Sequence, residues 1–212
     1  FPVVGRVPYK GFFDFEAGKR EQRATDSAGF DAVLRPAAAF STLGWFNDPL
    51  LPTTLGLDSL ELATTIIHEL VHTTYYAPGA AVFNESLANF VGSRGAERFF
   101  RARGQTAAAD EVAKRWDDER VLGEFWSGLY ASLDSSFRLH PGDRSARLAA
   151  RETVFARARN ALRVDIAPRL VTIDSGFVSR VELNTASVLA RRIYLTDLEL
   201  FERVLRADSG DV

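Results

Sequence analysis

The chain has 212 residues, 46% of them hydrophobic, which is enough for one domain with a sizeable core. Its formal net charge is −2 at pH 7, with acids and arginines mixed along the chain, so we expect no nucleic-acid partner. It has no cysteine, which excludes disulfides and thiolate ligands, and no segment approaches the roughly 20 apolar residues of a membrane helix.

The opening of the sequence predicts short extended segments around one polar helix. Residues 2–15 are β-branched and aromatic, broken by glycine and proline, and this pattern favours extended pieces. A helix is expected over residues 16–27. Strands are expected over residues 30–35, ended by a proline, and over residues 40–46.

The rest of the sequence predicts mainly helices. Residues 58–61 have the spacing of a capping box, and the helix they begin should reach about Tyr76. Further helices are expected over residues 83–98 or beyond, 107–137 and 144–163. An extended piece near residues 171–177 should precede a helix through Val188 and another over residues 197–206.

The sequence His68-Glu69-Leu70-Val71-His72 carries the clearest chemistry. Residues four apart share one face of a helix, so the two imidazoles can converge on one tetrahedral Zn²⁺. Glu69 projects about 100° away, where it can accept a proton from water activated by the metal. The alternative is two hydrogen-bonded core histidines, although two of the chain's three histidines occupy the ligand positions.

Glu85 is the candidate for the third protein ligand that a catalytic zinc site needs. Residues 73–84 contain a Pro-Gly break, which allows the chain to turn and return past the metal. A glutamate near the start of a helix is more ordinarily a partner of the helix dipole.

Residues 84–92, Asn-Glu-Ser-Leu-Ala-Asn-Phe-Val-Gly, resemble the second zinc helix of the thermolysin-like metallopeptidases, the gluzincins. The resemblance implies that Glu85 is a zinc ligand and that Asn89 lies where the family has an acid that supports the first histidine. Asn89 is neutral and the ligand spacing is shorter than usual, so we expect no close thermolysin relative.

The chain also resembles, along most of its length, the bacterial family labelled putative aminopeptidases. Residues 2–5, 7–9, 11–13, 35–36, 41–50, 66–72 and 83–92 carry this similarity. It implies a zinc-dependent peptidase, and we expect an aminopeptidase. The gluzincin resemblance implies an α+β, zincin-like fold, in which a small N-terminal sheet lies beside the HExxH helix and a mainly helical half follows. We expect one domain over residues 1–212, with a sheet part (1–57), zinc-binding helices (58–104) and a helical part (105–212).

The family resemblance also gives an expected location. Members usually carry an N-terminal export or lipoprotein segment, and this chain starts at Phe1 and contains no methionine. We therefore expect a processed chain in the periplasm or envelope, which associates with a membrane through such a segment or through a larger assembly.

Three weaker sites complete the prediction. The piece at residues 41–48 is expected to line the substrate groove, with Trp45 and Phe46 in a side-chain pocket or in the core. Asp48 is a candidate for binding the substrate α-ammonium group, or for holding the turn before a proline. Tyr194 lies in a C-terminal stretch that resembles the family, and we expect it to donate to the oxyanion.

The sequence leaves several other assignments open. His140 is the alternative oxyanion donor, although its place at a helix end favours a capping role. Tyr75 and Tyr76 are expected in the core. An endopeptidase and a non-catalytic zincin-fold subunit are the rival functions, and histidine with carboxylate also suits other first-row metals.

Overall fold

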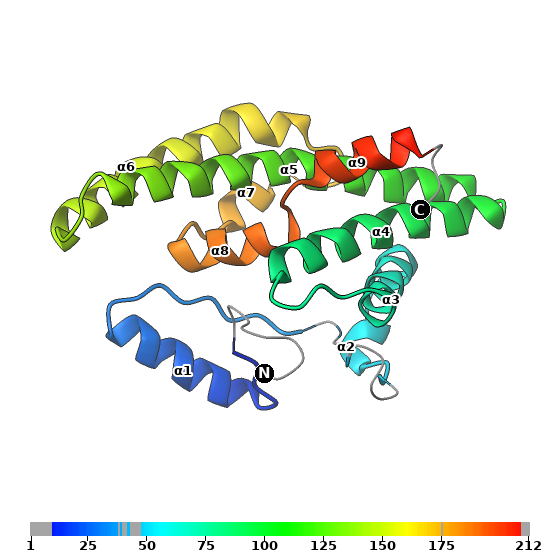
Figure 1. The fold of residues 1–212 in the computed structure, drawn as a ribbon, viewed down its shortest axis with the longest axis horizontal. Helices are drawn as coiled ribbons and strands as arrows, with labels where there is room; N and C mark the ends of the chain where they lie inside the picture. Colours follow the sequence, from blue (N-terminus) through cyan, green and yellow to red (C-terminus); the bar gives the residue numbers. More distant parts are fainter. Residues whose placement is uncertain (1–9, 38, 40–41, 43–47, 175, 209–212) are drawn as a thin grey trace.

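A computed structural model describes residues 10–37, 39, 42, 48–174 and 176–208. Over these ranges the regular structure is entirely helical and contains no strand (Figure 1). The predicted α+β fold with an N-terminal sheet is therefore wrong. The predicted strand at residues 40–46 and the first part of the extended segment at 2–15 lie largely outside the described residues.

The segment predicted as a strand at residues 30–35 has no strand beside it in the described ranges. Its polar anchor is a side chain, because Asp31 accepts hydrogen bonds from the Arg151 guanidinium (3.0 Å) and from the Thr185 amide (2.7 Å). β-Branched and aromatic residues favour extended backbone, but a sheet also needs a neighbour for its backbone groups. The segment is therefore held by side-chain contacts.

The extended piece predicted near residues 171–177 is also not part of a sheet. The backbone amides of Val171 and Thr172 donate to the buried Asp118 carboxylate on α5, at 2.8 and 2.7 Å. The short helix α7 (Gly176–Arg180) then begins inside the predicted range. A buried carboxylate thus supplies the acceptors that a neighbouring strand would have supplied.

Six predicted helices are confirmed, with boundaries that shift by a few residues: α1 (Phe15–Ser27), α3 (Ser59–Thr74), α4 (Ala81–Ala102), α5 (Thr106–Arg138), α6 (Arg144–Ala161) and α9 (Leu198–Ala207). The helix predicted through Val188 is divided into α7 and α8 (Thr185–Tyr194), because a capping box at Asn184 starts a new helix. Asp58 caps α3 as expected, since its carboxylate accepts the amides of Leu60 and Glu61. The short helix α2 (Pro52–Leu55), the π turn η1 (Leu162–Ile166) and the 3₁₀ turn η2 (Ala167–Arg169) were not predicted.

Helix α5 is the longest described helix, at about 50 Å. Helices α4 and α6 pack along it, and α8 and α9 contact both α4 and α5 (Figure 1). The largest fully buried apolar side chains lie in this group: Trp116, Trp126, Phe155, Leu162 and Val188. The bundle therefore fixes α4, against which α3 then packs.

In the part of the chain that the structure describes, no helix combines the length and the apolar character that a membrane span requires.

Candidate metal centre

Helix α3 presents two imidazoles on one face, toward α4. His68 and His72 are one helical turn apart, and their Nε2 atoms lie 3.2 Å from each other. Both side chains are largely shielded from solvent, at 13% and 6% exposure. Two ring nitrogens held this close inside the fold need a shared proton or a shared cation between them.

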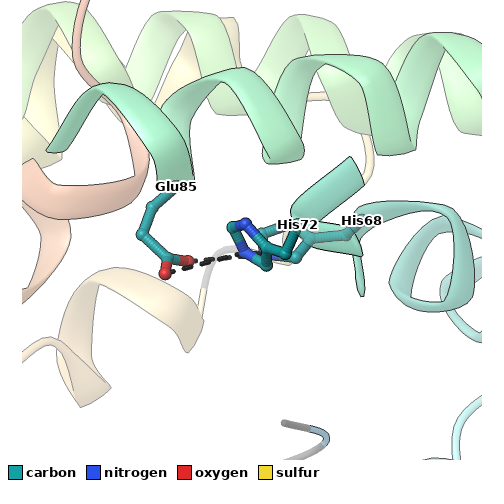
Figure 2. A group of neighbouring side chains, drawn as sticks. All are labelled: His68, His72 and Glu85. Atoms are coloured by element: carbon teal, nitrogen blue, oxygen red, sulfur yellow. Dashed lines mark hydrogen bonds and ion pairs between the residues drawn. The ribbon is translucent and has the colours of Figure 1, made fainter. Parts of the chain in front are cut away.

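Glu85 reaches the same point from α4. Figure 2 shows its carboxylate directed at the two imidazoles, with Oε2 3.4 Å from His68 Nε2 and Oε1 3.7 Å from His72 Nε2. The ligand atoms of the three residues all lie within 4.8 Å of one another. The structure therefore brings together the three side chains that the sequence predicted as metal ligands.

The spacing of these atoms fits a small tetrahedral cation. Zinc binds imidazole nitrogen and carboxylate oxygen at about 2.0–2.2 Å, so neighbouring ligand atoms of a tetrahedral site lie roughly 3.3–3.5 Å apart. The observed separations of 3.2, 3.4 and 3.7 Å are close to that range, the last two to different oxygens of Glu85, and one atom from each residue lies within 4.8 Å of the others. A metal fits the donor set, and three protein ligands leave the fourth position for water or substrate.

The turn between α3 and α4 aims Glu85 at the histidines. The buried side-chain amide of Asn84 closes this turn, because it accepts from the Ala77 amide (2.9 Å) and donates to the Ala77 carbonyl (2.8 Å). The sequence resemblance contained Asn84 but did not assign it a role. It is a positioning residue immediately before the ligand.

Gly92 lets α4 approach the histidine helix. A Cβ at this position would lie 2.8 Å from the Thr64 carbonyl oxygen and 3.3 Å from the His68 Cβ. Both contacts are tighter than side chains normally allow, so any larger residue would push the two helices apart. The separation of the ligands therefore depends on a glycine seven residues after Glu85.

The electrostatics of the carboxylates suit different roles. Burial by itself raises the pKa of Glu85, but the imidazoles of His68 and His72 outweigh it and lower the pKa to about 2. Burial raises the pKa of Glu69, the imidazoles oppose this, and the charges of Glu85 and Asp48 add to the rise. Glu85 is thus ionised as a ligand must be, whereas Glu69 is moved toward the pKa of a useful proton acceptor.

Tyr194, the last residue of α8, lies beside the metal ligands. Its ring centroid is 6.4 Å from that of His68. Burial raises the pKa of its phenol, the charge of Glu85 adds to this and that of Arg35 opposes it, so the hydroxyl keeps its proton at neutral pH. Ser86 holds this helix end to α4, since its Oγ donates to the Ile193 carbonyl and accepts from the Thr196 amide, both at 3.1 Å.

His140, the alternative oxyanion donor, lies far from this site. It follows the end of α5, roughly 30 Å along that helix from Glu119, which contacts α4 beside the ligands. The His140 carbonyl accepts from the Asp143 amide in the turn before α6. The structure therefore places Tyr194, and not His140, near the ligands.

Asn89 makes different contacts from those expected. Its side-chain amide donates to Glu119 on α5 (2.8 Å) and to the Tyr194 carbonyl (3.4 Å), and no hydrogen bond joins it to His68 among the described residues. Burial raises the pKa of Glu119 to about 7, against the opposing effects of Asn89 and Arg191. Asn89 thus supports the end of α8, and its acidic partner Glu119 was not singled out in the sequence.

His72 is oriented by packing and by its contact with His68. Its Nδ1 is buried without a hydrogen-bond partner in the described part of the chain, and its ring lies 6.2 Å from that of Tyr76. Tyr76 is half-buried beside the site, whereas Tyr75 is 54% exposed, so the prediction that Tyr75 lies in the core is wrong.

The predicted substrate-binding residues are only partly described. Trp45 and Phe46 lie outside the described residues. The Asp48 carboxylate accepts from the Thr42 amide at 2.9 and 3.0 Å, and its charge also acts on Glu69. Asp48 therefore contributes negative charge beside Glu69.

Comparison with known proteins identifies the family. A family model described as "Putative aminopeptidase" matches residues 1–212. Searches of curated proteins and of solved structures give no match. Because the family match covers the whole chain, the protein belongs to the putative aminopeptidase family.

Proposed function

We propose that this protein is a zinc-dependent aminopeptidase, with the metal held by His68, His72 and Glu85. The observation that carries the proposal is the convergence of two imidazole nitrogens and one ionised carboxylate at separations that fit a tetrahedral cation. The family match supports peptidase chemistry for the same chain.

Bound zinc supplies a Lewis acid for the scissile carbonyl and lowers the pKa of water. The protein groups supply the rest of the proposed mechanism. Glu69, with its raised pKa, accepts the proton of the attacking water and returns it to the leaving amine. The protonated phenol of Tyr194 donates a hydrogen bond to the oxyanion that develops on the carbonyl oxygen.

The proposal is tested on protein purified without added metal. We expect near one zinc per chain by mass spectrometry, and hydrolysis of peptides that have a free N-terminus. Acetylation of the N-terminus should abolish cleavage, because an aminopeptidase recognises the free amine. Cleavage of the acetylated peptide would indicate an endopeptidase, and the absence of metal and turnover would favour the non-catalytic subunit. A different metal in the protein would correct the assignment of zinc.

Replacement of Tyr194 by phenylalanine tests the oxyanion donor. We expect kcat to fall by about 10²–10³-fold, with metal content unchanged, because one preorganised donor is lost while the ring and its packing remain. Steady-state kinetics on a free-amine peptide measures this. Tyr130→Phe is the matched control. Tyr130 lies on α5, and its ring packs against the guanidinium of Arg192 on α8. Equal activity in the two variants would remove Tyr194 from the mechanism.

A further inference from the structure

Arg35 lies at the candidate site, although no role was predicted for it there. The extended segment before it is fixed at Asp31, which binds the Thr185 amide at the start of α8. Four extended residues cover about 13 Å, and the ten-residue α8 has nearly the same length. The segment therefore runs along α8 (Figure 1). It brings Arg35 to the other end of α8, where the guanidinium carbon lies 4.9 Å from the centre of the Tyr194 ring.

The charge of Arg35 is not matched by a carboxylate. Within the described ranges neither Arg35 nor Arg191 forms an ion pair, whereas most other arginines of α4, α5 and α6 do. Arg191 precedes Tyr194 by one helical turn on α8, and its guanidinium lies over Trp126 at 5.9 Å. Burial lowers the pKa of Arg191, and the positive charge of Arg35 lowers this pKa further. Two exposed cations thus lie beside Tyr194 without an ion pair among the described residues, although the charge of Glu119 also acts on Arg191.

The site therefore has negative charge beside the candidate metal ligands and positive charge beside Tyr194. The charges of Glu85 and Asp48 act on Glu69 beside the candidate ligands, and the Arg35 guanidinium lies 4.9 Å from the centre of the Tyr194 ring. Negative charge favours a substrate ammonium group, and an arginine fork favours a carboxylate. A bound peptide would accordingly lie with its amine toward the carboxylates and a negative group toward Arg35.

We infer that Arg35, assisted by Arg191, binds a carboxylate of the peptide substrate, an inference that rests on the proposed peptidase function. The distances from His68 to Tyr194 and from Tyr194 to Arg35 together span at most about 11 Å, which an extended peptide covers in about three residues. The carboxylate is thus the C-terminus of a di- or tripeptide, or an acidic side chain within three residues of the cleaved bond.

Three peptides distinguish the sources of the carboxylate: Leu-Gly-Gly, its C-terminal amide, and the amide of Leu-Glu-Gly. If the C-terminus binds Arg35, the free acid should have a kcat/KM about 10- to 100-fold above that of its amide, the effect of one charge-assisted contact. If an acidic side chain binds there, the Leu-Glu-Gly amide should show this advantage instead. In either case Arg35→Ala should reduce the ratio to about 1, and Arg35→Lys should restore part of it.

A second readout separates this inference from the proposed function. Calorimetry measures the same three peptides binding to the metal-loaded Glu69→Gln protein, which is expected to cleave them about 10²–10⁴-fold more slowly than the native protein. Arg157→Ala, an exposed arginine on α6, is the matched control and should keep the preference. Arg35-dependent binding without turnover in the native protein would sustain the carboxylate site and refute the peptidase. Turnover with equal ratios in native protein and Arg35→Ala would overturn the carboxylate site and leave the peptidase intact, because an arginine that only positions Tyr194 changes all three peptides alike.

Discussion

Glu69→Gln is expected to keep its bound metal and to lower kcat by about 10²–10⁴-fold, the range for loss of a general acid–base group. Glutamine has nearly the same shape as glutamate, so α3 and the neighbouring ligands His68 and His72 keep their packing. It cannot accept a proton at neutral pH, which removes the role assigned to the half-buried carboxylate. Single-turnover kinetics on a free-amine peptide, with metal content measured on the same sample, checks both parts.

The control for this variant is Glu61→Gln, two turns earlier on α3 and exposed. It changes the same functional group on the same helix away from the ligands. Full activity in metal-loaded Glu69→Gln would mean that another group accepts the proton. Loss of metal from that variant would mean that Glu69 helps to hold the cation, and the kinetic result would then not report on proton transfer.

His68→Ala is expected to lower the metal content from near one ion per chain to near zero and to abolish peptide hydrolysis. The variant removes one of three protein ligands and leaves His72 and Glu85. A metal that binds only the folded state stabilises it by RT ln(1 + [L]/Kd), so a chelator should lower the melting temperature of the native protein. The chelator should have no such effect on His68→Ala, because this variant has no bound metal to lose.

His140→Ala is the matched control, since it removes the remaining histidine of the chain at the distant end of α5. We expect it to retain metal, activity and the response to chelator. If His68→Ala kept a full complement of metal, the assigned ligand set would be wrong. If His140→Ala lost metal as well, the loss would reflect unfolding, which circular dichroism would reveal.

The sequence predicted helices well and the sheet badly, and the two results have different physical causes. A helix such as α3 closes its hydrogen bonds within itself, and its start is marked by the local cap at Asp58. A strand needs a partner that local sequence does not specify. Within residues 30–35, Asp31 instead accepts hydrogen bonds from Arg151 and Thr185, which are more than a hundred residues away in the sequence.

The site divides in the same way. His68 and His72 converge because of helical periodicity, which can be read from their spacing alone. The contacts of Asn89 with Glu119, and of Arg35 with Tyr194, join segments 30 and more residues apart. Helical or strand periodicity does not predict contacts between such distant residues. The sequence around Asn89 therefore did not predict that its side-chain amide contacts α5.

The hydrogen bonds of Ser86 to the backbone at the end of α8 affect the order in which the site can assemble. The three ligand residues lie within one continuous stretch of helix, turn and helix, which requires only short loops to close. Ser86 reaches the backbone on either side of Tyr194 across 107 and 110 residues. Contacts between nearby residues form faster than contacts between distant ones. We therefore expect His68, His72 and Glu85 to come together during synthesis before α8 has packed against α4, and Tyr194 to join them only after α8 has docked.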